Sequence, residues 1–216
     1  MTAIADRQVE LWLVRHGETE WAASGRHTSR TDVDLTAGGR AQAKALASEL
    51  ASIGFGLVLS SPRRRALDTA RLAGFAERVT VDPDLSEWDY GRYEGLTTEE
   101  IRHRVPGWTI WHGEAPGGET GGQVSARADR VIARVSGAGV ERAIVFSHGH
   151  MLRVLAARWL GLRAADGGWF ALDVASISVL GWEHGARVVV RWNVAAAVRA
   201  GVEAEAAATE APSRGS

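Results

Sequence analysis

The sequence predicts a three-layer α/β/α protein with a mostly parallel central sheet. Short apolar runs rich in β-forming residues alternate with helical patterns along the chain. The 216 residues, 45% hydrophobic and 24% charged, are enough for one domain with a sizeable core. In sheets of this kind, ligands bind beyond the carboxyl ends of the strands. Polar residues that directly follow a strand are therefore the candidates for function.

The first part of the chain contains three predicted strands and two predicted helices. A charged His-Gly-Glu step ends the first strand, and Thr36 is a capping residue before the first helix. In that helix Ala43, Leu46 and Leu50 share one apolar face, and Gly74 ends the second helix. In chain order, the predicted elements are a strand over Val9–Arg15, a helix over Ala37–Leu50, a strand over Leu57–Leu59, a helix over Arg63–Ala73 and a strand over Val79–Val81.

The second part begins with an irregular segment over residues 82–118, which is interrupted by proline and tryptophan residues. We expect short helices there over Thr97–Arg104 and Trp108–His112. The elements predicted after it are a helix over Gln123–Val135, a strand over Ala143–Phe146, a helix over Met151–Leu160 and a hairpin of Ile177–Trp182 with Val188–Trp192. Residues 1–194 are expected to form a single domain, and the Ala/Glu-rich residues 195–216 a flexible tail.

Composition argues against several classes of function. Lys+Arg 25 against Asp+Glu 26 gives a net charge of -1, which does not favour nucleic-acid binding. The absence of cysteine excludes disulfides, zinc-thiolate sites and cysteine nucleophiles. Lys44 is the only lysine, so no Walker A phosphate loop is present. Because no apolar run is long enough to cross a bilayer and no signal peptide is evident, we expect no membrane partner and a cytoplasmic protein.

Three predicted strands end in polar steps that suit a phosphate group. These steps are Arg15-His16-Gly17-Glu18, Ser60-Ser61-Pro62-Arg63 and Ser147-His148-Gly149. If the strands are neighbours, two arginines and two histidines meet at one place. Guanidinium groups offer planar forks that match phosphate oxygens, and a histidine can attack phosphorus or donate a proton. The two helices that follow Pro62 and Gly149 would also direct their positive N-termini at that place.

Each of these residues also has an ordinary structural explanation. His148 is equally consistent with a buried histidine that is hydrogen-bonded to a backbone carbonyl. The run Arg63-Arg64-Arg65 is equally consistent with a solvent-exposed helix face. The occurrence of such a polar segment at the end of each of three strands favours a phosphate site. For Arg64 and Arg65 we keep the structural explanation and expect surface positions. We expect surface positions for His103, His112 and His184, a helix-capping role for His150, and a place at the substrate entrance for His27, Arg30, Trp21 and Arg153.

The motif Leu13-Val14-Arg15-His16-Gly17-Glu18-Thr19-Glu20-Trp21 closely resembles the signature of the histidine phosphatase superfamily, which includes the cofactor-dependent phosphoglycerate mutases. The resemblance extends from about residue 10 to 193. Its further motifs are Gly25-Arg26-His27-Thr28, Asp34-Leu35-Thr36, Ser60-Ser61-Pro62-Arg63, Glu87-Trp88-Asp89-Tyr90-Gly91, Gly117-Gly118-Glu119 and Ser147-His148-Gly149. The sequence is most similar to the cofactor-independent acid phosphatases, and also to the sedoheptulose-bisphosphatase branch. A phosphoglycerate mutase-like fold is thereby implied.

This resemblance implies roles for individual catalytic residues. His16 matches the nucleophile that becomes a phosphohistidine, and Arg15, Arg63 and His148 match the rest of the phosphate pocket. Glu87 matches the proton donor to the leaving oxygen. Positive donors around the phosphorus lower the barrier to phosphoryl transfer. Neighbouring positive charge also lowers the pKa of His16 and keeps it neutral for attack.

Other positions match the edge and the supports of this pocket. Thr28 matches a hydroxyl that contacts the phosphate, and His27 and Ser29 are further candidates for substrate binding. The mutases usually have asparagine at the position of Ala22, and glycine is common at Ser29; both differences lie at the rim of the pocket, so they concern the substrate and leave the chemistry intact. The supporting residues are Glu18, Ser61, Gly17 and Gly149.

We therefore expect a metal-independent phosphomonoesterase of the acid phosphatase type, without cofactor, acting on small phosphorylated metabolites. The alternatives are a cofactor-dependent phosphoglycerate mutase and a sugar bisphosphatase. Mutases carry a segment rich in lysine and arginine after the acid loop, whereas residues 96–120 have no lysine and only Arg102 and Arg104. A non-catalytic phosphate-binding module, or a metal-dependent hydrolase using His148 and His150, is a further alternative, but no HExxH spacing is present. A homodimer is compatible with the sequence, and the oligomeric state stays open.

Overall fold

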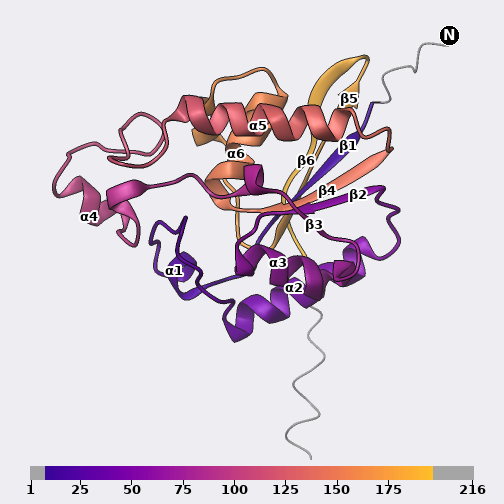
Figure 1. Cartoon of the computed structure of the whole chain (residues 1–216), viewed down its shortest axis with the longest axis horizontal. Helices are drawn as coiled ribbons and strands as arrows, with labels where there is room; N and C mark the ends of the chain where they lie inside the picture. The colour runs from indigo at the N-terminus through magenta and orange to yellow at the C-terminus, as the bar shows by residue number, and fades with distance from the viewer. Residues whose placement is uncertain (1–7, 197–216) are drawn as a thin grey trace, which may run out of the picture.

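The computed structural model describes residues 8–196, which form one six-stranded sheet covered by helices on both faces (Figure 1). The strands are β1 (Glu10–Arg15), β2 (Leu57–Ser60), β3 (Thr80–Val81), β4 (Arg142–Ser147), β5 (Ser176–Glu183) and β6 (Ala186–Ala195). Their order in the sheet is β3-β2-β4-β1-β5-β6. The first four of these strands are parallel, and the hairpin of β5 and β6 is antiparallel. The predicted three-layer α/β fold is confirmed.

The helices fall into two groups on the two faces of the sheet (Figure 1). The helices are α1 (Glu20–Ala23), α2 (Ala37–Leu50), α3 (Arg64–Ala70), α4 (Thr98–Arg102), α5 (Gly121–Ser136) and α6 (Gly149–Trp159). Helices α5 and α6 pack together on one face, and α2 and α3 cover the other. No helix within residues 8–196 is long and apolar enough to span a membrane.

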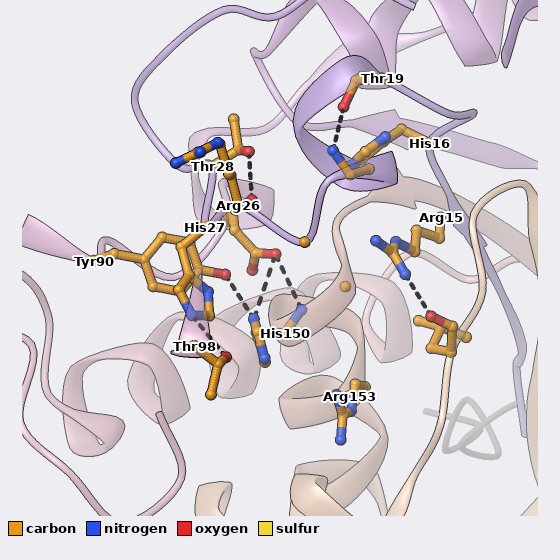
Figure 2. A pocket seen from close by; sticks show the side chains of 15 residues that line it. Arg15, His16, Thr19, Arg26, His27, Thr28, Tyr90, Thr98, His150 and Arg153 are labelled. Atoms are coloured by element: carbon orange, nitrogen blue, oxygen red, sulfur yellow. Dashed lines mark hydrogen bonds and ion pairs between the residues drawn. The ribbon is translucent and has the colours of Figure 1, made fainter. Parts of the chain in front are cut away.

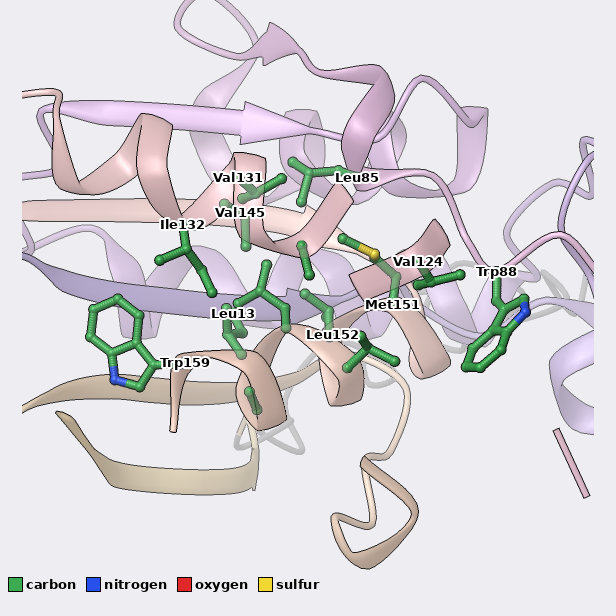
Figure 3. Close-up of a cluster of buried hydrophobic side chains, with 14 of the residues drawn as sticks. Leu13, Leu85, Trp88, Val124, Val131, Ile132, Val145, Met151, Leu152 and Trp159 are labelled. Atoms are coloured by element: carbon green, nitrogen blue, oxygen red, sulfur yellow. The ribbon is translucent and has the colours of Figure 1, made fainter. Parts of the chain in front are cut away.

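Strand β1 shows how the sequence produces these layers. All four of its central residues are buried, and successive side chains point to opposite faces. Leu11 and Leu13 join the cluster with α5 and α6, which Figure 3 shows around Leu152 and Trp159. Trp12 and Val14 join the second cluster, with the residues of α2. A strand buried on both faces is apolar at every position, which explains the continuous apolar run in the sequence.

The register of the parallel strands brings the three polar strand ends to one edge. Arg15 is paired with Ser147 at the ends of β1 and β4, and Ser60 is paired with Phe146 at the end of β2. The residues that follow each strand therefore start from neighbouring positions. This confirms the expectation that the three motifs lie at one edge of the sheet.

Two predicted helices differ from the observed elements. The helix expected over Arg63–Ala73 ends as α3 at Ala70 and continues as a wider turn over Arg71–Phe75, in which Gly74 has φ +95. The helix expected over Trp108–His112 is wrong, because that segment forms only turns. There the indole nitrogen of Trp108 donates a hydrogen bond to the carbonyl of Glu114. This side-chain hydrogen bond stabilises the segment instead of the backbone hydrogen bonds of a helix.

The remaining boundaries lie close to their predicted positions. Helix α1 was not predicted, and neither were three short helical turns over residues 83–85, 91–93 and 164–169. The single domain was expected to end at residue 194, and β6 continues to Ala195. The tail expected over residues 195–216 lies outside the described residues from 197 onward.

Candidate active site

A cavity of about 260 Å³ opens at the carboxyl edge of the parallel strands. Its walls come from the end of β1, the segment after α1, the loop that carries Glu87, and the first turns of α6 (Figure 2). The lining residues that the sequence analysis named are Arg15, His16, His27, Thr28, Glu87, Gly149, His150 and Arg153. The carboxyl-edge position is the one expected for a ligand site in this fold.

His16 is a buried, neutral imidazole with one nitrogen tied to the backbone. Its Nδ1 lies 2.7 Å from the carbonyl oxygen of Gly17. Because a carbonyl can only accept, Nδ1 carries the proton and donates, which leaves the lone pair on Nε2. Burial and the positive charges of Arg65 and Arg15 hold the pKa of His16 well below its usual value. The side chain therefore suits a nucleophile.

His148 lies beside His16, with ring centroids 5.2 Å apart, and is completely buried. Its Nε2 lies 2.7 Å from Oγ of Ser61, which also accepts the backbone N–H of Arg63. The Ser61 hydroxyl proton has no other acceptor among residues 8–196, so we assign it to Nε2 of His148. His148 then carries its own proton on Nδ1. Burial and the neighbouring cations lower the pKa of His148 well below its usual value.

Arg65 is a correction to the sequence analysis, which left it on the surface. Its side chain is only 1% exposed, and it donates to the carbonyl oxygens of Thr28 and Thr31. Its charge is also the largest electrostatic influence on both His16 and His148. Arg64, by contrast, is exposed as predicted. The signal was present in the sequence, because Arg65 precedes Thr69 by four residues and so shares its buried helix face.

Arg63, the guanidinium that the sequence analysis chose, is half-buried at the start of α3. Its charge contributes to the lowered pKa of His148, after those of Arg65 and Arg15. Arg15 is held by a hydrogen bond from Nη1 to the carbonyl of Leu172, at 2.5 Å. Three guanidinium groups therefore act on His148, where two were expected, and those of Arg65 and Arg15 also act on His16.

Glu87 connects the acid loop to the first turn of α6. Its Oε1 accepts the backbone N–H groups of Trp88 and Met151, both at 2.8 Å. Its Oε2 accepts the backbone N–H of His150 at 3.0 Å. Glu87 thus caps this helix N-terminus, where the free N–H groups favour a negative charge. Glu87 also lines the cavity, so its carboxyl group faces the space that a ligand would occupy.

The predicted substrate residues do not all reach the cavity. His27 and Thr28 line it, and burial lowers the pKa of His27 to about 4. Ser29 is not among the lining residues, because its buried hydroxyl donates to the carboxylate of Glu94. Arg153 lines the cavity, and its guanidinium stacks on Trp111, 4.4 Å from the ring centroid. Trp21 and Arg30 are not among the lining residues, and Arg30 pairs with Asp89.

The supporting residues act mainly through the backbone. Glu18 accepts a hydrogen bond from the hydroxyl of Thr36, which caps α2. Gly17 lies so close to Gly39 that a Cβ atom on Gly17 would collide with the carbonyl oxygen of Gly39. Gly149 begins α6, and a Cβ there would lie 3.4 Å from the guanidinium carbon of Arg15.

The histidines outside the phosphate pocket differ in position. His103, His112 and His184 are exposed, as predicted. The expectation that His150 caps the helix is wrong, because Glu87 supplies the cap. His150 instead lines the cavity, and its Nδ1 lies 2.6 Å from the hydroxyl oxygen of Tyr90. Within residues 8–196, no three histidine or acidic side chains form a group that could hold a metal ion.

The buried side-chain nitrogens without a partner in the described part of the chain belong to His148 and to the three arginines whose charges act on it, of which only Arg15 lines the cavity. Within residues 8–196, the buried side-chain nitrogens that lack a hydrogen-bond partner are Nε of Arg15, Nε of Arg63, Nε of Arg65 and Nδ1 of His148. Buried polar groups are ordinarily hydrogen-bonded, so four unpaired donors at one place call for an acceptor-rich ligand. A phosphate group has such oxygens and the negative charge that the guanidiniums match.

The fold and site define an enzyme of phosphoryl transfer with a neutral histidine at its centre. A profile of the histidine phosphatase superfamily (branch 1) matches residues 11–195. The chain therefore belongs to this superfamily, and it is a phosphatase. This membership, predicted from the motifs, is confirmed.

Individual relatives agree with that assignment. The chain is 46% identical over 184 residues to an acid phosphatase of Mycobacterium tuberculosis, covering 84% of this chain and 90% of that protein. It is 36% identical over 181 residues to the sedoheptulose 1,7-bisphosphatase of Saccharomyces cerevisiae, covering 69% of this chain and 67% of that protein. A solved structure of a Mycobacterium tuberculosis open reading frame product superposes with a TM-score of 0.83 at 42% identity, covering 88% of this chain and 100% of that one. The mycobacterial glucosyl-3-phosphoglycerate phosphatase with VO3 gives 0.77 at 29% identity, covering 87% and 100%.

Proposed function

We propose that the protein hydrolyses phosphate monoesters of small metabolites through a covalent phosphohistidine on His16, without a metal ion. The observation that carries this proposal is the set of four unpaired buried nitrogens around a neutral imidazole. Such preorganised donors stabilise the charge that develops on the phosphoryl oxygens in the transition state. The roles of Arg15, Arg65 and His148 follow from this arrangement, with Arg63 as an additional cation at the edge.

In the first step, Nε2 of His16 attacks phosphorus and the bond from phosphorus to the leaving oxygen breaks. Glu87 gives its proton to that oxygen, so that an alcohol leaves. The hydrogen bond from Nδ1 to the carbonyl of Gly17 favours this step, because it supports the positive charge that the ring acquires on phosphorylation. The guanidiniums hold the phosphoryl oxygens throughout.

In the second step, water attacks the phosphorus and the nitrogen–phosphorus bond breaks. The ionised Glu87 accepts a proton from that water, which returns Glu87 to its acid form and His16 to its neutral form. Inorganic phosphate is the product. One carboxyl group serves as acid and then as base because it lies at the wall from which both the leaving alcohol and the water approach.

The size and charge of the cavity favour small, anionic substrates. Its volume of about 260 Å³ is near the lower end of ligand pockets, and Arg15, Arg26 and Arg153 all line it. The names of the relatives, an acid phosphatase and two phosphatases of sugar-derived phosphates, support the same substrate class. Hydrolysis is favoured over the mutase reaction, because residues 96–120 lack the lysine-rich segment described above. A homodimer and a cytoplasmic location stay predictions from the sequence.

The test is to trap the intermediate. Purified enzyme is mixed with a radiolabelled phosphate monoester that it hydrolyses, quenched in alkali and examined for acid-labile, alkali-stable protein-bound phosphate. We expect labelled protein from the wild type and none from His16→Ala. Activity is measured with EDTA, and 3-phosphoglycerate is assayed for phosphate release and for conversion to 2-phosphoglycerate. Loss of activity with EDTA, full activity in His16→Ala, or dominant conversion to 2-phosphoglycerate would overturn the proposal.

A further inference from the structure

The hydroxyl of Tyr90 and the imidazole of His150 form a hydrogen-bonded pair beside Glu87. The Tyr90 oxygen lies 2.6 Å from Nδ1 of His150 (Figure 2). That same Nδ1 lies 4.0 Å from Oε2 of Glu87, and the backbone N–H of His150 donates to this oxygen at 3.0 Å. The three side chains therefore form a compact group at the cavity wall, and the chemistry described so far uses only one of them.

The two oxygens of Glu87 are held differently. Oε1 accepts two backbone N–H groups, from Trp88 and Met151, and these occupy both of its lone pairs. Oε2 accepts one backbone N–H, that of His150, which leaves a lone pair for the catalytic proton, and the Tyr90 hydroxyl also interacts with this carboxylate. Oε2 is also the oxygen next to the imidazole of His150. The environment of the proton-carrying oxygen is thus set by both His150 and Tyr90.

Tyr90 is buried and His150 is half-buried, and the surroundings shift the pKa of each side chain in a direction that keeps it neutral. Tyr90 is 2% exposed, and burial together with the Glu87 carboxylate raises the pKa of its hydroxyl well above the usual value. Burial and the charges of His27, Arg153 and Arg15 lower the pKa of His150. A protonated phenol and a neutral imidazole share one hydrogen bond, which fixes the imidazole ring in place. Arg65 and Arg15 are the cations that act on Tyr90 itself.

We propose that Tyr90 and His150 are positioning residues for Glu87, holding the Oε2 oxygen at the cavity in the orientation that delivers its proton to the leaving group. The proposal rests on the proposed role of Glu87 as the proton donor. A fixed imidazole keeps its ring at a constant position beside Oε2 as the carboxylate becomes charged, whereas the backbone N–H of His150 is held by α6 itself. Removing the phenol oxygen frees the ring, and the carboxylate then loses its alignment with the leaving oxygen.

The test uses two aryl phosphates whose leaving groups differ in their need for a proton. The 2,4-dinitrophenolate anion is stable enough to depart from 2,4-dinitrophenyl phosphate without being protonated. The leaving group of phenyl phosphate must be protonated as it departs. The rate of the phosphorylation step is measured by rapid quench as the burst of released phenol, in the wild type and in Tyr90→Phe. Tyr93→Phe is the matched control, because Tyr93 packs against Trp108 and does not line this cavity. Thermal unfolding is recorded for each variant.

With phenyl phosphate we expect Tyr90→Phe to slow phosphorylation about tenfold or more, which is part of the roughly 10²–10⁴-fold that general acid catalysis contributes. With 2,4-dinitrophenyl phosphate we expect a change of no more than about twofold, because that step needs no acid. Tyr93→Phe should match the wild type on both substrates. If Tyr90→Phe does not fold, His150→Gln is put through the same comparison and decides the question.

Equal loss on both substrates, a change in KM alone, or no change would overturn the proposal, since each shows that the pair acts on binding or packing only. Glu87→Gln separates this result from the proposed function. If Glu87→Gln is slowed on phenyl phosphate and spared on 2,4-dinitrophenyl phosphate while Tyr90→Phe is not, only the positioning role fails. If Glu87→Gln shows no dependence on the leaving group, the proposed acid itself is wrong.

Discussion

The hydroxyl oxygen of Ser61 lies 2.7 Å from Nε2 of His148, at a place where neither residue has any solvent exposure. This contact directs the one proton of the neutral imidazole to Nδ1, on the opposite side of the ring. Nδ1 is one of the buried nitrogens that have no partner within the described part of the chain. Ser61, which does not line the cavity, therefore determines which nitrogen of His148 carries the proton.

Replacing Ser61 by alanine should lower kcat, and because it leaves a buried imidazole nitrogen unpaired it should also lower the free energy of unfolding by about 1–3 kcal/mol. Without the hydroxyl, both tautomers of His148 become accessible, and one of them presents a lone pair to the phosphate oxygens. The loss of about one hydrogen bond in the transition state, about 1–1.5 kcal/mol, corresponds to a decrease in kcat of about five- to tenfold. Ser60→Ala is the control, because the Ser60 hydroxyl donates to a carbonyl and not to a histidine. Equal kinetics of the two variants would contradict the assignment.

Replacing Arg65 by methionine should remove a principal donor of the phosphate pocket. We expect kcat/KM for a phosphate monoester to fall about 10²–10³-fold, the usual effect of deleting one such donor. Because the positive charge of Arg65 lowers the pKa of His16, its loss should raise that pKa. Activity would then be lost at a higher pH on the acid side, since protonated His16 cannot attack. The pH dependence of kcat/KM is the measurement.

Arg64→Met is the matched control for Arg65. Arg64 is exposed, and its guanidinium pairs only with the exposed Asp34. Exposed ion pairs of this kind contribute about 0–1 kcal/mol, so this variant should keep wild-type kinetics and pH dependence. If Arg64→Met is impaired and Arg65→Met is not, the assignment of the two arginines is reversed.

The contrast between Arg64 and Arg65 shows what could be predicted from the sequence. The strand-end motifs, the sheet and the place of His16, His148 and Glu87 depend on patterns of a few adjacent residues, and these patterns predicted them. The identity of the second guanidinium depends on which face of α3 is buried. That face is visible in the spacing of Ala66, Thr69 and Ala70, but the consecutive arginines hide it.

Other features depend on contacts between distant segments, which no local pattern encodes. His150 was expected to cap a helix because it directly precedes the helix predicted from Met151, yet the cap comes from Glu87, 63 residues earlier. Trp108 suggested a helix, but its indole binds the chain at Glu114 and stabilises a turn instead. In both cases a tertiary hydrogen bond decides the local structure.

The buried His27 should make folding less stable in acid. Burial lowers its pKa from 6.5 to about 4. Between these two values the unfolded chain binds a proton at this residue and the folded protein does not, so stability falls as the pH falls from 6.5 toward 4. A shift of this size corresponds to a loss of about 3 kcal/mol in the free energy of unfolding. The loss is complete once the pH lies below the pKa of His27 in the folded protein.

The measurement is urea unfolding of the wild type and of His27→Gln at several pH values between 7 and 4. Glutamine does not titrate, so the free energy of unfolding of the variant should fall less steeply over this range. The wild type also contains His16, His148 and His150 with lowered pKa values, and their contribution is common to both proteins. Parallel curves for the two proteins would contradict the prediction.

Gly38 and Gly39 are adjacent in α2, yet alanine should have opposite effects at the two positions. A Cβ on Gly39 would collide with the carbonyl oxygen of Glu18 and lie 2.7 Å from its backbone nitrogen, two contacts that cannot be relieved without moving the chain. A Cβ on Gly38 would meet nothing closer than 3.6 Å. We expect Gly39→Ala to lower the free energy of unfolding by about 1–3 kcal/mol. Gly38→Ala should raise it by about 0.5–1 kcal/mol.

The two variants should also differ in activity. Glu18 follows the Gly17 carbonyl that holds His16, so displacing this segment weakens the hydrogen bond that directs Nε2 at the phosphorus. Gly39→Ala should therefore lower kcat even at temperatures where the protein is fully folded, whereas Gly38→Ala should keep it. Urea unfolding and steady-state kinetics on the same preparations separate the two effects. A stable, fully active Gly39→Ala variant would mean that the contact between α2 and the nucleophile loop is not needed to orient His16.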